Sequence, residues 1–214
     1  GYNLKVFRED GTVCEPDEKG IVGIVPPLPP GCLSTVWGND ERFVSTYFSL
    51  FRDPQVYSSF DWGIQDKDGY HYILGRTDDV INVAGHRLGT REIEEAIQGH
   101  PGIAEVAVVG VADQLKGQIP MAFAVVKDAG SISSPEKRIE LEKAVFKQVD
   151  DSLGAIARPS RVHFLTILPK TRSGKLLRRS IQALAEGRDP GDLTTIEDPA
   201  ALEQLQLALS SKAA

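Results

Sequence analysis

The sequence is poor in the features that mark secreted, membrane and nucleic-acid-binding proteins. It has only two cysteines, Cys14 and Cys32, which are too few for a disulfide framework and lack metal-ligand spacing, so we expect a reducing compartment. No apolar run approaches the ~18 residues of a membrane helix, and the first ten residues lack the basic and then apolar segments of a signal peptide. A net charge of −6 does not favour a nucleic-acid partner. We therefore expect a cytoplasmic protein, or a mitochondrial-matrix protein in a eukaryote, without membrane or nucleic-acid partners.

Composition and residue patterns indicate a globular chain whose two halves differ. Apolar residues make up 41% and charged residues 25% of its 214 residues, as in ordinary globular domains, and the length allows one large domain or two small ones. The first half is rich in β-branched runs and turn residues, so it reads as mostly β. Its predicted elements are strands at residues 4–7 and 20–25, an extended connector at the proline-rich residues 26–31, a helix at residues 41–48 with Asp40 as N-cap, and a hairpin turn at residues 66–69.

The second half alternates between strand and helix patterns and predicts an α+β fold, a small sheet with helices on it. The predicted strands are residues 80–83, 103–111, 121–126 and 162–165. The predicted helices are residues 91–98 with Thr90 as cap, a long helix that starts at Ser134 and Pro135 with an apolar face of Ile139, Ala144, Val145, Val149 and Leu153, residues 176–185, and residues 200–208.

A long stretch without acidic residues runs through the second half. From Arg158 to Ala185 there is no Asp or Glu, whereas seven basic residues occur: Arg158, Arg161, Lys170, Arg172, Lys175, Arg178 and Arg179. On composition alone, a solvated basic surface is as good an interpretation as a site. The local order favours a site, because Ser173-Gly174-Lys175 forms a flexible loop just before a predicted helix. There a lysine ammonium can reach a phosphate oxygen, and the helix N-terminus favours an anion.

Two adjacent carboxylates, Asp78 and Asp79, lie where the strand-rich sequence gives way to the second half. They are either exposed caps on a turn or a hinge, in which a few residues absorb a large change in φ and ψ. Arg76 and Arg87 flank the pair and are either surface salt-bridge partners or ligands of one phosphate-bearing molecule. His86 has no nucleophile beside it, so a packing or hydrogen-bonding role is favoured over a catalytic one.

Three motifs in this order carry a resemblance to a known family. They are Tyr57–Asp61 followed by Asp66–Tyr70, Gly75–Asp79 followed by Asn82–Leu88, and Pro169–Lys175. Together they resemble the C-terminal portion of AMP-forming acyl-CoA synthetases, in the acetyl-/propionyl-CoA synthetase branch of the adenylating enzymes. Residues 39–48 favour the short-chain branch, and residues 195–199 lean towards propionate. The resemblance covers nearly the whole chain; the family's phosphate-gripping loop, acyl pocket and adenine platform lie upstream of these motifs.

The resemblance implies a domain organisation and a reaction. Residues 1–77 would be the β-rich end of a large N-terminal domain, residues 78–79 a hinge, residues 80–190 a mobile C-terminal α+β domain with a mixed or antiparallel sheet, and residues 191–214 a tail. Enzymes of this family join a carboxylate and ATP into an acyl-adenylate, release pyrophosphate, rotate the small domain and transfer the acyl group to CoA. Adenylation concentrates negative charge, so a removable cation helps that step alone. We expect ATP or AMP, CoA and Mg²⁺ as cofactors, and acetate or propionate as the acid; the fragment alone should be nearly inactive.

The resemblance also assigns roles to individual residues. Asp61 would bind the ribose hydroxyls, Arg76 would bind the ribose or a phosphate, and Arg87 would bind the phosphates. Lys175 would be the catalytic cation that reaches the carboxylate and the α-phosphate, and Asp78 would be the hinge residue. Ala84 and Gly85 would line the pantetheine path, and a cation would bind to the backbone of Gln98, His100 and Ile103. Acetylation of Lys175 by a lysine acetyltransferase, reversed by a deacetylase, would delete its charge and switch off the first step.

Two departures from the family pattern stand out. Ser59 and Phe60 replace a Thr and a Gly before Asp61, which alters the loop that should meet the nucleotide. Asp150 stands near the position of an arginine that some relatives use for the CoA nucleotide phosphate. Two other functions remain open: an adenylating enzyme that loads a carrier protein or oxidises its adduct, and a free-standing module that binds a nucleotide or a partner.

Overall fold

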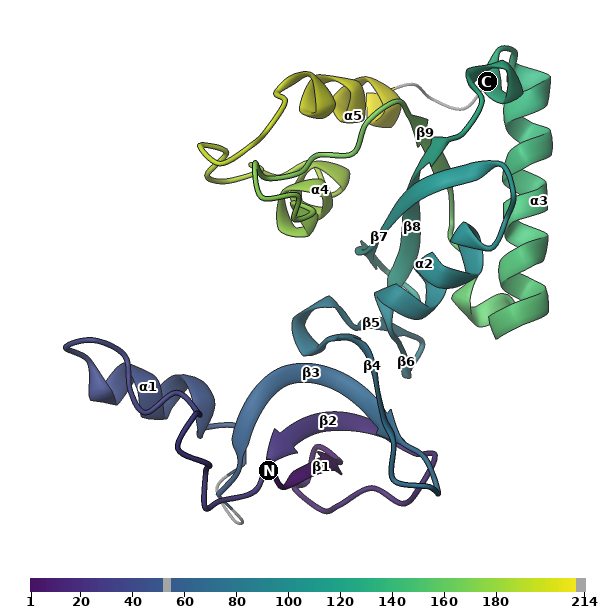
Figure 1. Cartoon of the computed structure of the whole chain (residues 1–214). Coiled ribbons are helices and arrows are strands. Elements are labelled where there is room, and N and C mark those ends of the chain that lie inside the picture. Colours follow the sequence, from purple (N-terminus) through teal and green to yellow (C-terminus); the bar gives the residue numbers. More distant parts are fainter. Residues whose placement is uncertain (52–54, 211–214) are drawn as a thin grey trace. The chain divides into compact units, whose positions relative to one another are not determined.

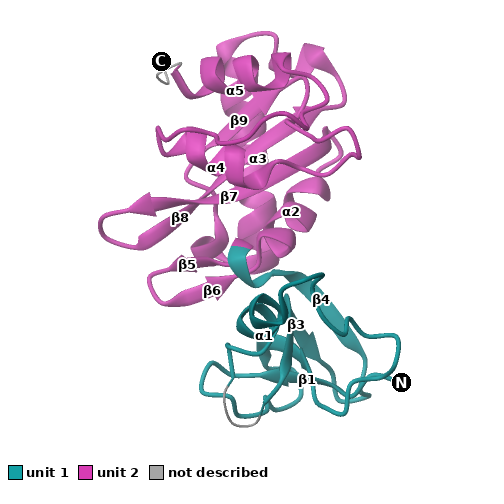
Figure 2. Cartoon of the chain, turned by 90° about the vertical axis from the view of Figure 1, so that its left-hand side faces the viewer, with its two compact units in different colours: residues 1–78 teal, residues 79–214 magenta. Residues whose placement is uncertain are grey.

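A computed structural model describes residues 1–51 and 55–210 of the chain. It divides the chain into two compact units, unit 1 (Gly1–Asp78) and unit 2 (Asp79–Ala214), which Figure 2 shows in different colours. The fold class is α+β, as predicted, with a mainly antiparallel sheet and helices in each unit (Figure 1). Among the described residues, no helix is both long enough and apolar enough to cross a membrane.

Unit 1 is built on an antiparallel meander in which each strand pairs with the next along the chain. Apolar side chains of these strands, such as Phe7 and Trp62, are buried. Asp66 forms the predicted hairpin turn, because its Oδ1 accepts the amide of Tyr70 at 2.8 Å. The elements of unit 1 are β1 (Leu4–Phe7), β2 (Lys19–Ile24), α1 (Asp40–Tyr47), β3 (Tyr57–Gln65), β4 (His71–Arg76) and, at the boundary with unit 2, the 3₁₀ turn η1 (Thr77–Asp79).

Unit 2 holds a five-stranded sheet in its described residues, with the path β6-β5-β8-β7 and with β9 beside β8. The strands are β5 (Ile81–Val83), β6 (His86–Leu88), β7 (Ile103–Asp113), β8 (Gly117–Val126) and β9 (Val162–Leu165). The helices are α2 (Thr90–Gln98), α3 (Pro135–Leu153), α4 (Arg178–Ala185) and α5 (Ala200–Ser210), with the 3₁₀ turns η2 (Ala129–Ile132) and η3 (Ala155–Ala157). β9 runs parallel to β8, and the other pairs are antiparallel, so the sheet is mixed.

The central ladder of unit 2 is buried on both faces. Along β7, Val106 and Val108 belong to one apolar cluster, whereas Ala107 and Val109 belong to a second, as the period of two along a strand requires. The first cluster contains residues of α2 and α3, and the second contains residues of α4 and α5. The two helix pairs therefore cover opposite faces of the sheet (Figure 1). This double burial explains the almost unbroken apolar run from Val106 to Val111.

Two predicted helix caps are wrong by one residue. Asn39, not Asp40, caps α1, since its Oδ1 accepts the amide of Arg42 at 2.9 Å. Thr90 is the first residue of α2, and the cap position is Gly89, which offers no side chain. Both errors come from choosing between neighbouring residues that are each good caps on propensity alone.

The predicted apolar face of α3 is partly wrong. Leu141, which the prediction omitted, is buried together with Val145 and Val149, whereas Ile139 is 45% exposed. A spacing of four residues places the three buried side chains on one stripe of the helix. Ile139 lies outside that stripe, because it is six residues from Val145.

A partly buried ion-pair cluster joins α2, β7 and α4 to Asp79, the first residue of unit 2. At the start of α4 the guanidinium of Arg178 pairs with both carboxylate oxygens of Glu94 on α2, with Nη2 2.9 Å from Oε2. Its Nε lies 3.4 Å from Oδ2 of Asp79. On β7, the amide of Val108 donates to Oε1 of Glu94 at 2.8 Å, and the Val108 carbonyl accepts from Arg178 at 3.2 Å.

The carboxylates of this cluster favour the charged form of Arg178. Burial opposes the charge of Arg178, but the hydrogen bond and charge of Glu94, with the charge of Asp79, raise the pKa of its guanidinium above the ordinary value. Glu94 is only 9% exposed. Removing either partner would therefore leave a charge with little water to solvate it.

Replacement of Glu94 by Ala should lower the free energy of unfolding by about 3 kcal/mol, because Arg178 would lose its buried partner. Glu95→Ala is the matched control, since Glu95 pairs with Arg91 on the exposed side of the same helix and should cost less than about 0.5 kcal/mol. Urea unfolding of the two variants measures both values. Equal losses in both variants would show that the cluster does not stabilise unit 2.

Candidate functional site

Most of the basic stretch at residues 158–185 is used for ion pairs with distant carboxylates. The pairs are Arg158–Asp150 at 2.8 Å, Arg161–Glu142 at 3.9 Å, Lys170–Glu105 at 2.7 Å and Arg178–Glu94 at 2.9 Å. Arg172 and Lys175 differ from these residues, because their side chains are exposed and no carboxylate pairs with them within residues 79–210. Two of the paired residues, Arg158 and Arg161, are still 45% and 44% exposed, so the solvated-surface interpretation stays open for them, whereas Arg172 and Lys175 lie on one loop.

The loop that carries Lys175 is a tight hairpin held by its own backbone. The amide of Thr171 donates to the carbonyl of Lys175 at 2.8 Å, and the amide of Gly174 donates back to the carbonyl of Thr171 at 2.8 Å. Gly174 has a φ of +81°, which a residue with a side chain adopts only under strain. The hydroxyl of Thr171 accepts the amide of Lys175 at 3.1 Å. The backbone of Lys175 is therefore fixed while its ammonium is free.

The helix that follows this loop starts later than predicted. α4 begins at Arg178 rather than Leu176, and its cap residue Leu177 makes no side-chain capping bond. The first amides of α4 thus lack a side-chain partner at the cap, three residues after Lys175. Such a helix start is favourable for a nearby anion.

In unit 1, the predicted nucleotide residues lie together at the end of the β3–β4 pair. Asp61 on β3 is the direct cross-strand partner of Arg76 on β4. The Nε of Arg76 lies 3.2 Å from Oδ1 of Asp78, so the predicted hinge carboxylate also restrains this arginine. A carboxylate and a guanidinium side by side can bind a diol and a phosphate of one nucleotide.

Phe60 adopts the backbone conformation that a glycine would favour. Its φ is +60°, in the left-handed region where a bulky residue is strained. The strain is accompanied by specific contacts: the guanidinium carbon of Arg76 lies 5.6 Å from the centre of the Phe60 ring, and the ring of Tyr47 lies 5.8 Å from it. Thr77 donates to the Phe60 carbonyl at 3.3 Å. The loop before Asp61 thus keeps a glycine-like path, and the added ring gives Arg76 a cation–π contact.

The predicted CoA-path residues form the tip of the β5–β6 hairpin. Ala84 and Gly85 have φ values of +49° and +86° between the paired residues Val83 and His86, a two-residue turn of the kind that hairpins favour. The amide of Ala84 donates to the carbonyl of Lys116 at 2.8 Å. No described heavy atom lies within 4 Å of the position that a Cβ on Gly85 would take, so the turn presents bare backbone.

Arg87 and His86 follow this turn on β6. Both side chains are exposed, and Arg87 is the cross-strand partner of Asn82 on β5. Asn82 in turn accepts the amide of Gly85 through its Oδ1 at 3.0 Å. The structure therefore groups Arg87 with Ala84 and Gly85 on one hairpin of unit 2.

The predicted cation ligands lie in the turn between α2 and β7. The carbonyl of His100 accepts the amide of Ile103 at 3.1 Å, and Nδ1 of His100 accepts the amide of Gly102 at 3.1 Å. The side chain of Gln98 donates to the carbonyl of Ala104 at 3.3 Å. These hydrogen bonds hold the turn. Elsewhere in the described chain no three His, Cys, Asp or Glu side chains gather in a way that could hold a metal ion.

The Asp150 departure is explained by a local ion pair. Arg158 donates to Asp150 at 2.8 Å, and this hydrogen bond lowers the pKa of the Asp150 carboxyl below its ordinary value. The carboxylate is therefore charged at neutral pH, and it would repel a phosphate.

Sequence reasoning missed three contributors to these sites. Glu94, Thr171 and the ring of Phe60 hold Arg178, the Lys175 loop and Arg76, respectively. One signal was present: a basic stretch that contains no acidic residue has to find its ion-pair partners elsewhere in the chain. The pairing itself joins residues 84 positions apart, which no local pattern reveals.

Comparison with known proteins gives the same family as the motifs. Residues 92–175 match the model of the AMP-binding enzyme C-terminal domain. The chain is 60% identical to propionate–CoA ligase of Escherichia coli (strain K12) over 98% of its own length and 33% of that protein. It is 45% identical to acetyl-coenzyme A synthetase of Pyrobaculum aerophilum, over 97% of its length and 30% of that protein.

A solved structure supports the fold. The anthranilate CoA ligase AuaEII in complex with anthranoyl-AMP matches with a TM-score of 0.73 and 28% identity, over 87% of this chain and 34% of that one. The chain spans about a third of the length of the curated relatives it matches. By its motifs, its fold and these matches, the chain is similar to the AMP-binding enzymes: residues 92–175 match their C-terminal domain, and nearly all of the chain is similar to about a third of a propionate–CoA ligase and of an acetyl-coenzyme A synthetase.

Proposed function

We propose that this chain is part of a short-chain acyl-CoA synthetase, an acid–thiol ligase that converts a carboxylate, ATP and CoA into acyl-CoA, AMP and pyrophosphate. The observation that carries the proposal is the Lys175 ammonium, which is exposed and unpaired among the described residues of its unit, whereas Lys170 and Arg178 are paired with carboxylates. The names of the relatives, propionate–CoA ligase and acetyl-coenzyme A synthetase, support propionate or acetate as the acid. They also favour CoA over a carrier protein as acceptor.

In the first step a carboxylate oxygen attacks the α-phosphorus of ATP. A C(=O)–O–P linkage forms, the bond from the α-phosphorus to the bridging oxygen breaks, and pyrophosphate leaves with the electron pair. Negative charge is greatest in the transition state, where Lys175 supplies a compact cation to the carboxylate and the α-phosphate without transferring a proton. Because this ammonium has no permanent partner, it can approach the phosphate without first breaking an ion pair.

In unit 1, Asp61 accepts hydrogen bonds from the ribose hydroxyls, and Arg76 binds the ribose or a phosphate. Two contacts orient Arg76 for this role: the carboxylate of Asp78 at 3.2 Å and the ring of Phe60 at 5.6 Å. Arg87 on β6 is the phosphate ligand that unit 2 contributes. The roles are those that the motif resemblance assigns, and the geometry within each unit is compatible with them.

In the second step the thiol of CoA gives up its proton to solvent and its sulfur attacks the acyl carbon. A C–S bond forms, the bond from the acyl carbon to the phosphate oxygen breaks, and AMP leaves with the electron pair. Ala84 and Gly85 line the pantetheine path, because the turn at Gly85 presents backbone with open space above it. A pantetheine arm carries amides that pair well with exposed backbone groups. The charged Asp150 makes the end of α3 an unfavourable place for the CoA phosphates.

Mg²⁺ enters with the nucleotide, since it is usually held by phosphates and one or two carboxylates rather than by a protein cage. A separate cation is assigned to the backbone of Gln98, His100 and Ile103. The His100 carbonyl already accepts one amide, and a carbonyl oxygen has a second lone pair for a cation.

Regulation and location belong to the same proposal. An exposed Lys175 on a hairpin loop is open to a lysine acetyltransferase, and acetylation would remove the charge that adenylation uses. Both cysteines are free thiols, which suits the cytoplasm or the mitochondrial matrix.

Replacement of Lys175 by Ala in the complete enzyme should reduce acid-dependent ATP–pyrophosphate exchange by about a thousandfold, because a preorganised charge at the transition state is lost. Thioester formation from supplied acyl-AMP and CoA should stay within about threefold, since the second step does not use this lysine. Lys143→Ala, on the exposed side of α3, is the control. An equal loss in both half-reactions would make Lys175 a structural residue.

Asp78 is proposed as the hinge on which unit 2 turns between the two steps. Asp78→Pro should slow at least one half-reaction by about tenfold or more, because proline fixes φ and traps one orientation. Asp78→Ala removes the same carboxylate from Arg76 but leaves φ free, so it separates the two effects. Stopped-flow rates of each half-reaction would measure them; unchanged rates in the proline variant would exclude a hinge at this residue.

A further inference from the structure

Part of the tail after α4 pairs with the Lys175 hairpin as a third backbone segment beside it. Thr171 and Ile196 form an antiparallel bridge. The two hydrogen bonds that flank it run from the amide of Arg172 to the carbonyl of Thr195 at 3.0 Å and from the amide of Glu197 to the carbonyl of Lys170 at 2.9 Å. Residues 170–172 thus lie between residues 175–176 on one side and residues 195–197 on the other.

Both ends of this tail strand, defined here as residues 195–197, are anchored. Upstream, the hydroxyl of Ser180 on α4 donates to the carbonyl of Pro190 at 2.9 Å. Downstream, α5 begins at Ala200, and its Leu205 is fully buried in the second apolar cluster. Within the strand, Ile196 is only 9% exposed. The tail strand is therefore fixed to the body of unit 2 independently of the loop that it touches.

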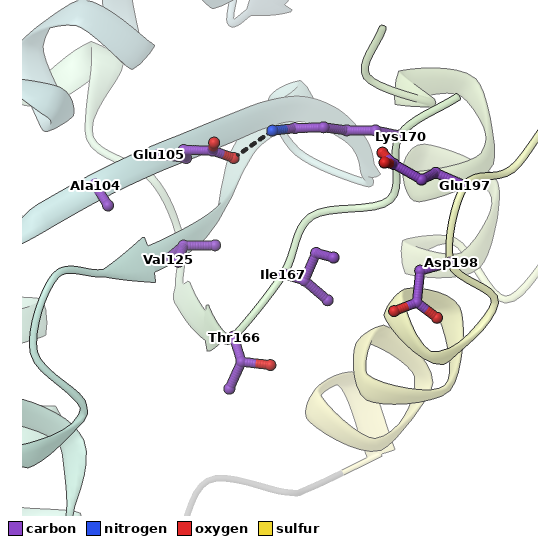
Figure 3. A pocket seen from close by; sticks show the side chains of 8 residues that line it. All are labelled: Ala104, Glu105, Val125, Thr166, Ile167, Lys170, Glu197 and Asp198. Atoms are coloured by element: carbon purple, nitrogen blue, oxygen red, sulfur yellow. Dashed lines mark hydrogen bonds and ion pairs between the residues drawn. The ribbon is translucent and has the colours of Figure 1, made fainter. Parts of the chain in front are cut away.

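Side chains at the base of the loop support the same arrangement. A pocket of about 560 Å³ is lined by Lys170 from the loop, Glu105 from β7 and Glu197 from the tail strand. Figure 3 shows Lys170 reaching across to Glu105, with Glu197 beside the start of the lysine side chain. The 2.7 Å ion pair of Lys170 with Glu105 attaches one end of residues 170–172 to the sheet. The tail strand holds the backbone of the same three residues by hydrogen bonds at both ends.

A two-segment hairpin of this size would be only marginally ordered by itself. Within the described residues of unit 2, the ammonium of Lys175 has no ion-pair partner that could order the loop. Order comes instead from the Lys170–Glu105 ion pair and from the backbone, where the tail strand supplies two hydrogen bonds to residues 170–172.

We propose that the tail strand is a positioning element for Lys175, with Ile196 as its anchor and the Glu197 amide as its key donor. This inference rests on the proposed function for its catalytic part alone. Loss of the tail strand should loosen the loop and slow adenylation, which uses Lys175. It should spare thioester formation, which does not.

Glu197 offers a clean test because its side chain is exposed and its amide makes the bond. Glu197→Pro removes the donor, whereas Glu197→Ala removes the side chain and keeps the donor. In the complete enzyme, hydrogen–deuterium exchange of a peptide spanning residues 169–177 should quicken about fivefold in the proline variant and stay unchanged in the alanine variant. Unchanged exchange in β7 and β8 shows that unit 2 remains folded.

The two half-reactions complete the experiment. Glu197→Pro should lower the kcat of ATP–pyrophosphate exchange about fivefold to tenfold and leave the rate from supplied acyl-AMP as it is in Glu197→Ala. Ile196→Asp should have the same pattern with a larger effect, and Leu207→Asp, on the exposed face of α5, should have none.

Equal exchange of the loop in Glu197→Pro and Glu197→Ala would overturn the proposal outright. Faster hydrogen–deuterium exchange of the loop together with equal effects on both half-reactions would overturn the catalytic part of the proposal. The tail strand would then order the loop without contributing specifically to adenylation. Failure of the proposed function is distinguishable from both outcomes, because the unsubstituted enzyme would then show no acid-dependent exchange at all.

Discussion

The long ladder between β7 and β8 is the interaction on which the rest of unit 2 depends. Its register runs from Ile103–Val126 to Asp113–Gly117, and both of its faces are covered by helices. Each functional segment of the unit is attached to it: the Ala84–Gly85 turn through the backbone beside Gly117, α4 through Val108, and the Lys175 loop through Glu105. Because both faces of this ladder are buried, it is rigid. Loops that have little stability of their own are held in place by their attachment to it.

Charge is distributed in unit 2 according to what each residue has to do. Basic residues that hold elements together are paired, and the most buried of them, Arg178, meets two carboxylates. The lysine that is proposed to act on a substrate has no partner among the described residues of unit 2, and the backbone around it takes over the task of positioning. A cation that must serve in one step and withdraw in the next cannot also be a structural ion-pair partner, and the fold separates these two tasks within ten residues of sequence.

In unit 1 an aromatic ring, rather than backbone pairing, helps to position a cation that is proposed to bind substrate. Phe60 replaces a glycine of the family pattern yet keeps a positive φ of +60°. The strain is of order 1–3 kcal/mol, and the contacts of the ring with Arg76 and Tyr47 offset part of it. The substitution therefore exchanges a flexible residue before Asp61 for one that holds the neighbouring arginine.

The fold class and most strands and helices could be predicted from the sequence, because they depend on local periodicity and turn chemistry. The Asp66 turn and the Ser134–Pro135 helix start are confirmed for that reason. Prediction from the sequence failed where two neighbouring residues could each cap the same helix, as at Asn39 and Asp40. It also failed where the residues in contact are far apart in the sequence. The Glu94–Arg178 pair and the Thr171–Ile196 bridge belong to the second kind, since only the folded chain brings those residues together. The roles of Lys175, Asp61 and the hinge at Asp78 stay predictions until kinetics test them.

Acid-dependent ATP–pyrophosphate exchange, measured with acetate, propionate and butyrate, tests the synthetase assignment most directly. The complete enzyme should exchange pyrophosphate into ATP with at least one of these acids, and the 214-residue chain alone should show little or none. The acid with the highest kcat/KM would then identify the substrate. Exchange with none of the acids in the complete enzyme, or exchange that does not depend on the acid, would contradict the assignment and leave a nucleotide-binding module as the better description.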